Sequence, residues 1–177
     1  GGGRDFGQPE AKARPRRISA EGRSFVRFDG ADDFLEAQGF AAGVREATVF
    51  VVAAPTTNLG MFRGVLAGAR RGENDYTSGL TVDLGPFAST RLETINVEGR
   101  GFQGFANVAS SPRDFRESVV LSVRIGSGPQ GAEIATWIDD VPQRPRARRV
   151  EPMTLDRITL GARLYSNEGT PPYVQGF

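Results

Sequence analysis

The sequence of 177 residues has no cysteine, no histidine, one tryptophan and one lysine. Without cysteine the chain forms no disulfide, zinc–thiolate cluster or haem-attachment motif. Without histidine it has neither an imidazole metal site nor a Ser–His or Cys–His nucleophile pair. The longest uninterrupted apolar run, Val49–Ala54, is far shorter than the roughly 20 residues of a membrane-spanning helix. The remaining chemistry belongs to carboxylates, arginines, hydroxyls, amides and aromatic rings.

Sequence motifs of common hydrolases are missing as well. β-Sandwich glucan hydrolases carry a Glu-x-Asp-x-x-Glu string, because strand alternation then points all three carboxylates into one cleft. Here Glu133 is followed by Ile134 and Ala135, and no such string occurs. A Gly-x-Ser-x-Gly motif and a glycine-rich phosphate loop are also absent. We therefore expect a protein that is not an enzyme.

Two arginine- and proline-rich clusters, residues 14–17 and 144–149, raise the question of a polyanionic partner. The formal net charge is only +1, and neither cluster interleaves aromatic residues as single-strand binders do. We interpret both clusters as solvated loop or linker, and we expect neither nucleic-acid binding nor membrane insertion.

The chain divides into an arm and one domain. Residues 1–22 combine glycine, proline and arginine with few large apolar residues, which predicts a flexible linker or arm. From residue 23 to 177, short β-rich runs alternate with Gly, Pro, Asn and Asp breaks, as in a sandwich or barrel. The expected strands are Ser24–Phe28, Asp33–Ala37, Thr48–Ala54, Phe62–Gly68, Gly79–Leu84, Arg91–Val97, Glu117–Ile125, Glu133–Asp139 and Leu155–Leu164.

Alternation along the strands predicts which faces are buried. One apolar face in the strand at 117–125 is formed by Val119, Leu121, Val123 and Ile125. A second face, in the strand at 155–164, is formed by Ile158, Leu160, Ala162 and Leu164. Val49–Ala54 is apolar on both faces, which predicts a central strand covered on both sides. Together these patterns predict an all-β, two-sheet antiparallel β-sandwich with a polar outer face on one sheet.

The string Phe28–Phe34 places Asp29, Asp32 and Asp33 around Gly30, between two aromatic-bearing strands. Aspartate and glycine supply the Asx hydrogen bonds and the positive φ of a tight turn. The same carboxylates could also lend oxygens to Ca²⁺, a hard cation that needs no histidine. The spacing does not match an EF-hand loop, so a structural turn and a calcium site both stay open.

Two polar clusters with aromatic residues fall in loops or at strand ends, where binding residues tend to lie. The first contains Asp75 and Tyr76, and the second contains Arg163, Tyr165 and Asn167. Sugar recognition uses such groups, because hydroxyls need polar partners and the apolar face of a sugar ring stacks on an aromatic ring. The alternative is that these side chains close turns and satisfy backbone groups.

The single tryptophan, Trp137, falls on the Glu133 and Asp139 side of its strand, opposite Ile134 and Ile138. A tryptophan on the wetter face is a candidate stacking platform for a saccharide. The alternative is a packed side chain, and a shift of one residue in register would reverse the assignment.

Several strings resemble a known family. They are Val26–Phe34, Ala47–Pro55, Asn74–Gly79, Asn96–Gly99 and Leu160–Asn167. From about Ser24 to Phe177 the sequence is similar to LamG-like jelly-roll domains of the concanavalin A-like lectin/glucanase superfamily, in a bacterial subgroup carried by large exported multidomain proteins. The resemblance implies a non-catalytic module that binds glycans or proteins, sometimes with Ca²⁺. It also implies a secreted, periplasmic or cell-surface location.

The sequence departs from that family at its end. Family members usually continue beyond Gly176–Phe177 into another apolar strand, and this sequence stops there. Compared with the family, the chain therefore resembles a fragment, a processed product, or a jelly roll whose last strand comes from elsewhere. An unfilled place in the sheet would leave unpaired edge groups ready to accept a strand. Two functions follow as expectations: a carbohydrate- or cell-surface-binding module, or a structural domain whose sheet is completed by a partner strand. A polysaccharide-active enzyme is the least favoured.

Overall fold

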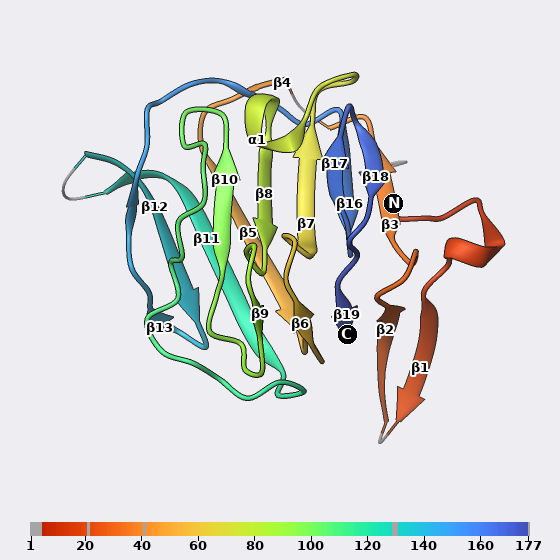
Figure 1. Cartoon of the computed structure of the whole chain (residues 1–177). Coiled ribbons are helices and arrows are strands. Elements are labelled where there is room, and N and C mark those ends of the chain that lie inside the picture. Colours follow the sequence, from red (N-terminus) through yellow and green to blue (C-terminus); the bar gives the residue numbers. More distant parts are fainter. Residues whose placement is uncertain (1–4, 21, 41, 129–130, 177) are drawn as a thin grey trace.

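The computed structural model describes residues 5–20, 22–40, 42–128 and 131–176, and this part of the chain is nearly all β (Figure 1). It contains a 3₁₀ helix, η1 (Ala11–Ala13), and a short helix, α1 (Asp75–Ser78). Neither is long and apolar enough to cross a membrane. The first strands are β1 (Arg16–Ala20), β2 (Arg23–Asp29), β3 (Leu35–Gln38), β4 (Ala42–Val44), β5 (Ala47–Ala53), β6 (Asn58–Leu59), β7 (Gly64–Ala69), β8 (Leu80–Asp83), β9 (Ala88–Ser89) and β10 (Asn96–Gly99). The later strands are β11 (Val119–Gly128), β12 (Gly131–Ile138), β13 (Val141–Pro142), β14 (Arg146–Ala147), β15 (Met153–Thr154), β16 (Arg157–Leu160), β17 (Arg163–Tyr165), β18 (Glu168–Thr170) and β19 (Gln175–Gly176).

Two antiparallel sheets form the body of the molecule, one behind the other in Figure 1. The front sheet has the order β10-β8-β7-β16-β3, and the back sheet has the order β13-β12-β11-β5, with β14 also paired to β12. A smaller sheet, β1-β2-β19, lies beside them, and three two-stranded ribbons (β15-β4, β17-β18 and β6-β9) connect the ends. The predicted all-β antiparallel sandwich is confirmed.

The core lies between the two sheets. On the back sheet, the predicted inward face of β11 is buried, with Val119, Leu121, Val123 and Ile125 all in the main apolar cluster. Across from it, the front sheet contributes inward residues of β8 and β10, including Val82 and Val97. In these strands the prediction of which alternate residues face the core was therefore correct. The opposite assignment would have turned the apolar residues to solvent.

The prediction for β5 was wrong. This strand pairs with β11 on one side and lies at the edge of the back sheet. Its outward residues are exposed, with Phe50 72% and Val52 71% accessible, whereas Val49 and Val51 pack against the core. Apolar residues on both faces of a strand do not by themselves show that both faces are covered. In β5 the outward residues Phe50 and Val52 are exposed to solvent.

The strand expected at Leu155–Leu164 is two strands, β16 and β17, separated at Gly161. Gly161 has φ +87°, and a Cβ there would lie 2.6 Å from Cδ1 of Phe28, so glycine permits both the turn and the close approach. The break redirects the chain. Ile158 packs in the main core, whereas Leu164 packs with Ala67 and Ala69 in a separate cluster.

The segment expected to be a flexible arm carries regular structure in its described part. β1 pairs with β2 in a hairpin, with Ile18 opposite Phe25. The amide of Phe34 donates to the carbonyl of Ala13 at 3.2 Å, and Gly7 bridges to Glu36. Backbone hydrogen bonds therefore join this segment to the domain, although its composition resembles a linker. The division of the chain at residue 22 stays a prediction.

Candidate functional site

The outer face of the front sheet carries polar side chains that are nevertheless buried. On β8 these are Thr81 and Asp83, and on β10 they are Asn96 and Glu98. A loop covers part of this face, since the amide of Gly104 donates to Oε2 of Glu98 at 3.1 Å and that of Ala106 to Oδ1 of Asn96 at 3.0 Å. The helix α1 packs on the same strands. The sequence folds this way because alternation in β8 and β10 sends every second residue away from the apolar core.

A buried guanidinium, that of Arg163 on β17, lies among three carboxylates of this face. It donates to Asp75 through two nitrogens, Nη2 to Oδ1 at 2.7 Å and Nε to Oδ2 at 3.1 Å. Its Nη1 lies 3.4 Å from Oδ2 of Asp83 and 4.0 Å from Oε1 of Glu98. The amide of Leu164 adds a further bond to Asp75 at 2.9 Å. We call Arg163, Asp75, Asp83 and Glu98 the ionic floor.

Burial and neighbouring charges have opposing effects on the pKa values of two residues of the ionic floor, Asp83 and Arg163. Burial raises the pKa of Asp83 to about 7, although Arg163 and the hydrogen bonds from Gly85 and Asn96 lower it. For Arg163, burial alone would lower the pKa, but the hydrogen bond and the charge of Asp75 raise it overall. Arg163 is thus always charged, and Asp83 exchanges a proton near neutral pH.

Aromatic rings surround the guanidinium and continue to the surface. The carbon Cζ of Arg163 lies 5.4 Å from the ring centres of Phe62 and Tyr165 and 5.8 Å from that of Tyr76. Tyr76 and Tyr165 meet edge to face at 5.9 Å. Phe62 meets Phe105 at 6.4 Å, and Phe105 meets Phe87 at 6.0 Å. We call these five rings the aromatic row.

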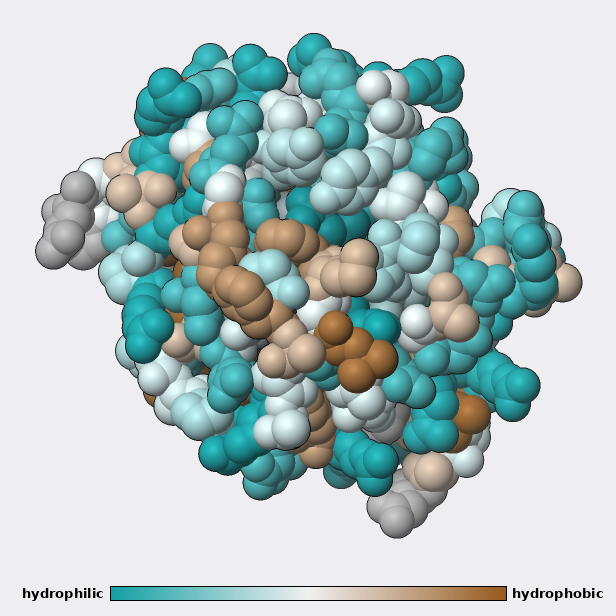
Figure 2. Space-filling model, viewed as in Figure 1, coloured by the Kyte–Doolittle hydropathy of each residue, from teal (hydrophilic) through white to brown (hydrophobic). Residues whose placement is uncertain are grey.

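The aromatic row is accessible along much of its length. Phe87 is 70% exposed, Phe105 42% and Tyr165 39%, and the apolar side chains of Leu59 and Met61 are also exposed. Figure 2 shows a hydrophobic patch near the middle of the face that the front sheet presents. Exposed apolar patches of this kind mark binding surfaces in soluble proteins.

The loop that carries Phe62 is held in an unusual conformation. Met61 and Phe62 have φ of +60° and +57°, a region that side chains other than glycine seldom adopt. Their amides donate to the carbonyls of Pro86 and Gly85 at 2.9 and 2.8 Å. Such conformations persist only where the surroundings hold them, and they cluster at binding sites. These hydrogen bonds therefore hold the backbone that carries Phe62.

The structure brings five of the six predicted ligand-binding residues together. Asp75 and Arg163 are buried in the ionic floor, where their side chains bond each other. Asn167 is also buried, and its Nδ2 donates to the carbonyl of Ala69 at 3.1 Å. Tyr76 and Tyr165 reach the surface and belong to the aromatic row. The polar members of the predicted group are thus engaged inside the protein.

The sixth residue, Trp137, lies elsewhere. It is half-buried on the outward face of the back sheet, in register with Ser122 and, one strand further, with Phe50. The guanidinium of Arg124 lies 5.6 Å from its ring. Trp137 therefore does not share a surface with Tyr76 and Tyr165.

Sequence reasoning missed the three phenylalanines of the aromatic row. A signal was present, because all three follow a glycine by one or two residues: Phe87 and Phe105 lie outside the expected strands, and Phe62 is the first residue of the expected strand Phe62–Gly68. A large apolar residue beside a turn glycine has no strand to bury it, which favours a surface role.

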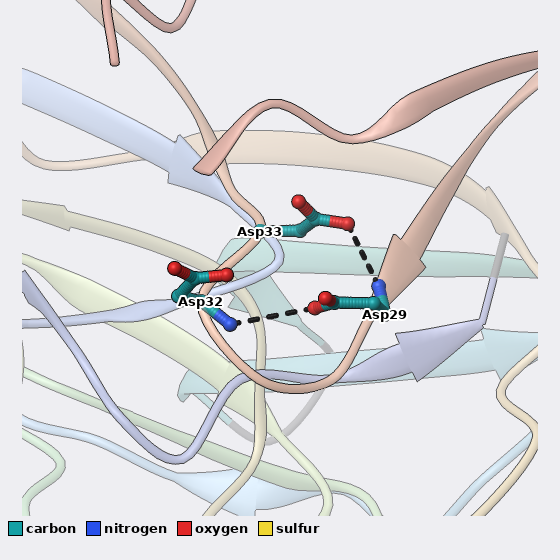
Figure 3. A group of neighbouring side chains, drawn as sticks. All are labelled: Asp29, Asp32 and Asp33. Carbon is teal, nitrogen blue, oxygen red and sulfur yellow. Dashed lines mark hydrogen bonds between the residues drawn. The ribbon is translucent and has the colours of Figure 1, made fainter. Parts of the chain in front are cut away.

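Figure 3 shows the three aspartates of the 28–34 turn. One carboxylate oxygen of each lies within 4.8 Å of the others. Asp33 accepts from the amide of Asp29 at 2.9 Å, and Asp29 accepts from the amide of Ala31 at 2.8 Å. The hydrogen bond from Ala31 lowers the pKa of Asp29, whereas burial raises that of Asp33. These bonds are those of the predicted structural turn.

Cationic side chains line the same hollow as this turn. Asp29 and Asp33 line a hollow of about 900 Å³. Its cationic lining residues are Lys12, Arg14, Arg16, Arg27 and Arg116. Ca²⁺ takes six to eight oxygen ligands, so the three aspartates would supply only part of its coordination. The calcium site stays a prediction.

No protein-family model matches the sequence, and no curated protein sequence matches it. Among solved structures, the chain is similar to a carbohydrate-binding module, CBM66 from Bacillus subtilis, with a TM-score of 0.42 and 12% sequence identity. The match covers 89% of this chain and 87% of that chain. A likeness this distant transfers neither a ligand nor residue roles, and the resemblance to LamG-like domains stays a prediction.

Proposed function

We propose that the chain is a non-catalytic carbohydrate-binding module that takes its ligand on the aromatic row. The observation that carries this proposal is the chain of exposed rings, Phe87, Phe105 and Tyr165, anchored on a buried guanidinium. The apolar face of a sugar ring stacks on such side chains, and rings held in place lose little freedom on binding. We place the module at the cell surface or in another exported setting.

The members of the site have two roles in this proposal. Tyr76, Tyr165 and the phenylalanines offer stacking faces, and the tyrosine hydroxyls offer hydrogen bonds to the ligand. Asp75 and Arg163 are positioning residues, because they are buried and act on a ligand only through the rings they hold. Trp137 is left out of this site, since it lies on the other sheet.

A matched pair of phenylalanines tests the proposal. Phe87, in the loop before β9, and Phe50, on β5 of the back sheet, are 70% and 72% exposed, so truncation of either has a similar small effect on stability. The ligand is sought by affinity electrophoresis, in which soluble β-glucan, xylan, mannan or fructan in the gel retards a protein that binds it. A glycan array extends the search to other sugars. We expect Phe87→Ala and Tyr165→Ala to weaken retention about tenfold, the worth of one stacked ring, and Phe50→Ala to leave it unchanged. Absence of binding to every glycan, or equal retention of Phe87→Ala and the unmodified protein, would contradict the proposal.

The alternative function, a protein-interaction domain whose sheet is completed by a partner strand, rests on other residues. The observation that favours it is that, among the described residues, no named strand pairs with the outer edge of β5.

A further inference from the structure

One oxygen of the Asp83 carboxylate connects to the phenylalanines of the aromatic row. Oδ1 accepts from the amide of Gly85 at 2.8 Å, and the carbonyl of Gly85 accepts from the amide of Phe62 at 2.8 Å. The ring of Phe105 packs on the same glycine, since a Cβ at Gly85 would lie 3.0 Å from Cε2 of Phe105. Phe87 follows Gly85 by two residues. This hydrogen bond of Asp83 therefore holds the turn that Phe62 and Phe105 contact and that leads into Phe87.

The other oxygen of Asp83 connects to the tyrosines of the row. Oδ2 accepts from Nδ2 of Asn96 at 3.1 Å and lies 3.4 Å from Nη1 of Arg163. The carbon Cζ of Arg163 lies 5.8 Å from the ring centre of Tyr76 and 5.4 Å from that of Tyr165. The two oxygens of one carboxylate therefore connect to both halves of the aromatic row.

The groups around Asp83 suit its ionised form. The amide of Gly85, Nδ2 of Asn96 and Nη1 of Arg163 are all donors, and they approach both oxygens. The amide of Asn96 is held in this orientation, because its Oδ1 accepts from the amide of Ala106 at 3.0 Å. A proton on either oxygen would meet at least one of these donors. Because Asp83 is fully buried, the neutral form has to give up one of its two connections to the row.

Several ionisable groups act on Asp83. Those around Asp83 and Arg163 come from four neighbouring elements: Asp75 and Tyr76 of α1, Glu98 of β10, Arg146 of β14, and Arg163 and Tyr165 of β17. Burial raises the pKa of Asp83 most, Arg163 lowers it, and the charge of Glu98 raises it, so that it comes to about 7. Arg63, just before β7, turns away, and its Nη1 donates to the carbonyl of Tyr173 at 2.7 Å. Both forms of Asp83 are therefore populated near neutral pH.

We propose that Asp83 is a further positioning residue, and that the aromatic row takes its binding arrangement when Asp83 is ionised. This inference rests on the proposed function, because it concerns ligand binding on the same rings. Protonation of Asp83 releases either the turn at Gly85 or the guanidinium of Arg163, so it loosens one half of the row. A glycan that stacks on both halves then selects the ionised form, and its binding releases the proton to solvent. Glycan affinity therefore rises with pH through neutrality.

The size of this effect follows from the fraction of protein that is ionised. With a pKa of about 7, Asp83 is ionised in about one-tenth of the molecules at pH 6 and in about nine-tenths at pH 8. When only the ionised form binds, the apparent affinity is proportional to that fraction. We therefore expect about tenfold tighter binding at pH 8 than at pH 6.

Proton NMR of the glycan-free protein tests the positioning without a ligand. The amide of Gly85 reports the charge of Asp83, and the ring protons of Phe62 and Tyr165 report the two halves of the row. We expect all three signals to shift with pH with one shared midpoint near 7. Asp83→Asn should abolish the three titrations, and Asp140→Asn, at an exposed turn, should preserve them. A titration of Gly85 without one of either ring, or no titration between pH 5 and 8, would overturn the proposal.

Affinity electrophoresis at pH 6, 7 and 8 tests the consequence for binding, with β-glucan, xylan, mannan or fructan in the gel. We expect the glycan that retards the protein at pH 8 to bind it about tenfold more weakly at pH 6. Asp83→Asn should lose this pH dependence, and Asp140→Asn should keep it. Equal binding at both pH values would overturn the inference and leave the proposed function intact.

The two experiments also separate failure of the inference from failure of the proposed function. If no glycan retards the protein at any pH, the proposed function is contradicted, and the ring titrations still decide the role of Asp83. Both experiments are made first on the unmodified protein, so a folding defect in Asp83→Asn leaves them decisive.

Discussion

The buried carboxyl of Asp83 makes the stability of the fold depend on pH in an unusual direction. Burial raises the pKa of Asp83 from 3.8 to about 7, against the lowering effect of Arg163. Between about pH 4 and 7 the folded protein therefore holds a proton that the unfolded chain has lost. Stability contributed by this group is full below pH 4 and is lost as pH rises to 7. At about 1.4 kcal/mol per pH unit, the loss is roughly 4 kcal/mol over the whole window.

Substitution Asp83→Asn isolates this effect. The variant loses an acceptor, because Asp83 accepts from the amide of Gly85 at 2.8 Å and from Nδ2 of Asn96 at 3.1 Å. Asparagine does not titrate, so position 83 gives the variant no pH dependence of its own, and the comparison uses the slope of stability against pH and not its absolute value.

Urea unfolding at intervals from pH 4 to 8 measures the slope. We expect the free energy of unfolding of Asp83→Asn to fall less steeply with pH than that of the unmodified protein, with a difference on the order of 10 °C in Tm across the window. Asp140→Asn is the control, because Asp140 is exposed at a turn with φ +64° that asparagine tolerates. Parallel curves for Asp83→Asn and the unmodified protein would refute the reasoning and show that Asp83 is ionised throughout.

Two further substitutions test the ionic floor and the chain reversal after β16. Arg163→Met leaves buried carboxylates without their cation and should lower the free energy of unfolding by about 3–5 kcal/mol in urea titrations, and a loss below 1 kcal/mol would contradict the buried pairing. Gly161→Ala and Gly104→Ala, at φ +87° and +88°, share the backbone strain of about 1 kcal/mol. A Cβ at Gly161 would also meet the ring of Phe28 and the carbonyl oxygen of Asp33, whereas a Cβ at Gly104 has no atom within 4 Å. Calorimetry should show a clearly larger fall in Tm for Gly161→Ala, and equal falls would exclude the contact.

The alternation of apolar and polar residues along the strands predicted much of this fold, because burial of one face of each sheet requires that alternation. Val119, Leu121 and Val123 had to share a face for β11 to bury anything. The same pattern could not show that β5 lies at an edge, since Phe50 and Val52 are apolar whether or not a layer covers them. Which strands lie beside β5 depends on how the whole chain folds, and the sequence of β5 alone does not determine it.

Of the candidate site, the sequence indicated Asp75, Tyr76, Arg163 and Tyr165, but neither the three phenylalanines nor the burial of the charged pair. Asp75 and Arg163 stood in separate polar clusters, 88 residues apart. Their ion pair depends on α1 and β17 meeting over the front sheet, which no local pattern reports. The break at Gly161 was also not predictable from local sequence. The side chain that leaves no room for a Cβ there belongs to Phe28, far earlier in the chain.

The near absence of lysine has a practical consequence. The single side-chain amine, on Lys12, is 78% exposed in η1. This 3₁₀ helix lies toward one side of the molecule in Figure 1, away from α1 and β10. Amine-directed coupling through Lys12 would tether the protein to a sensor chip with the rings of the front sheet still free.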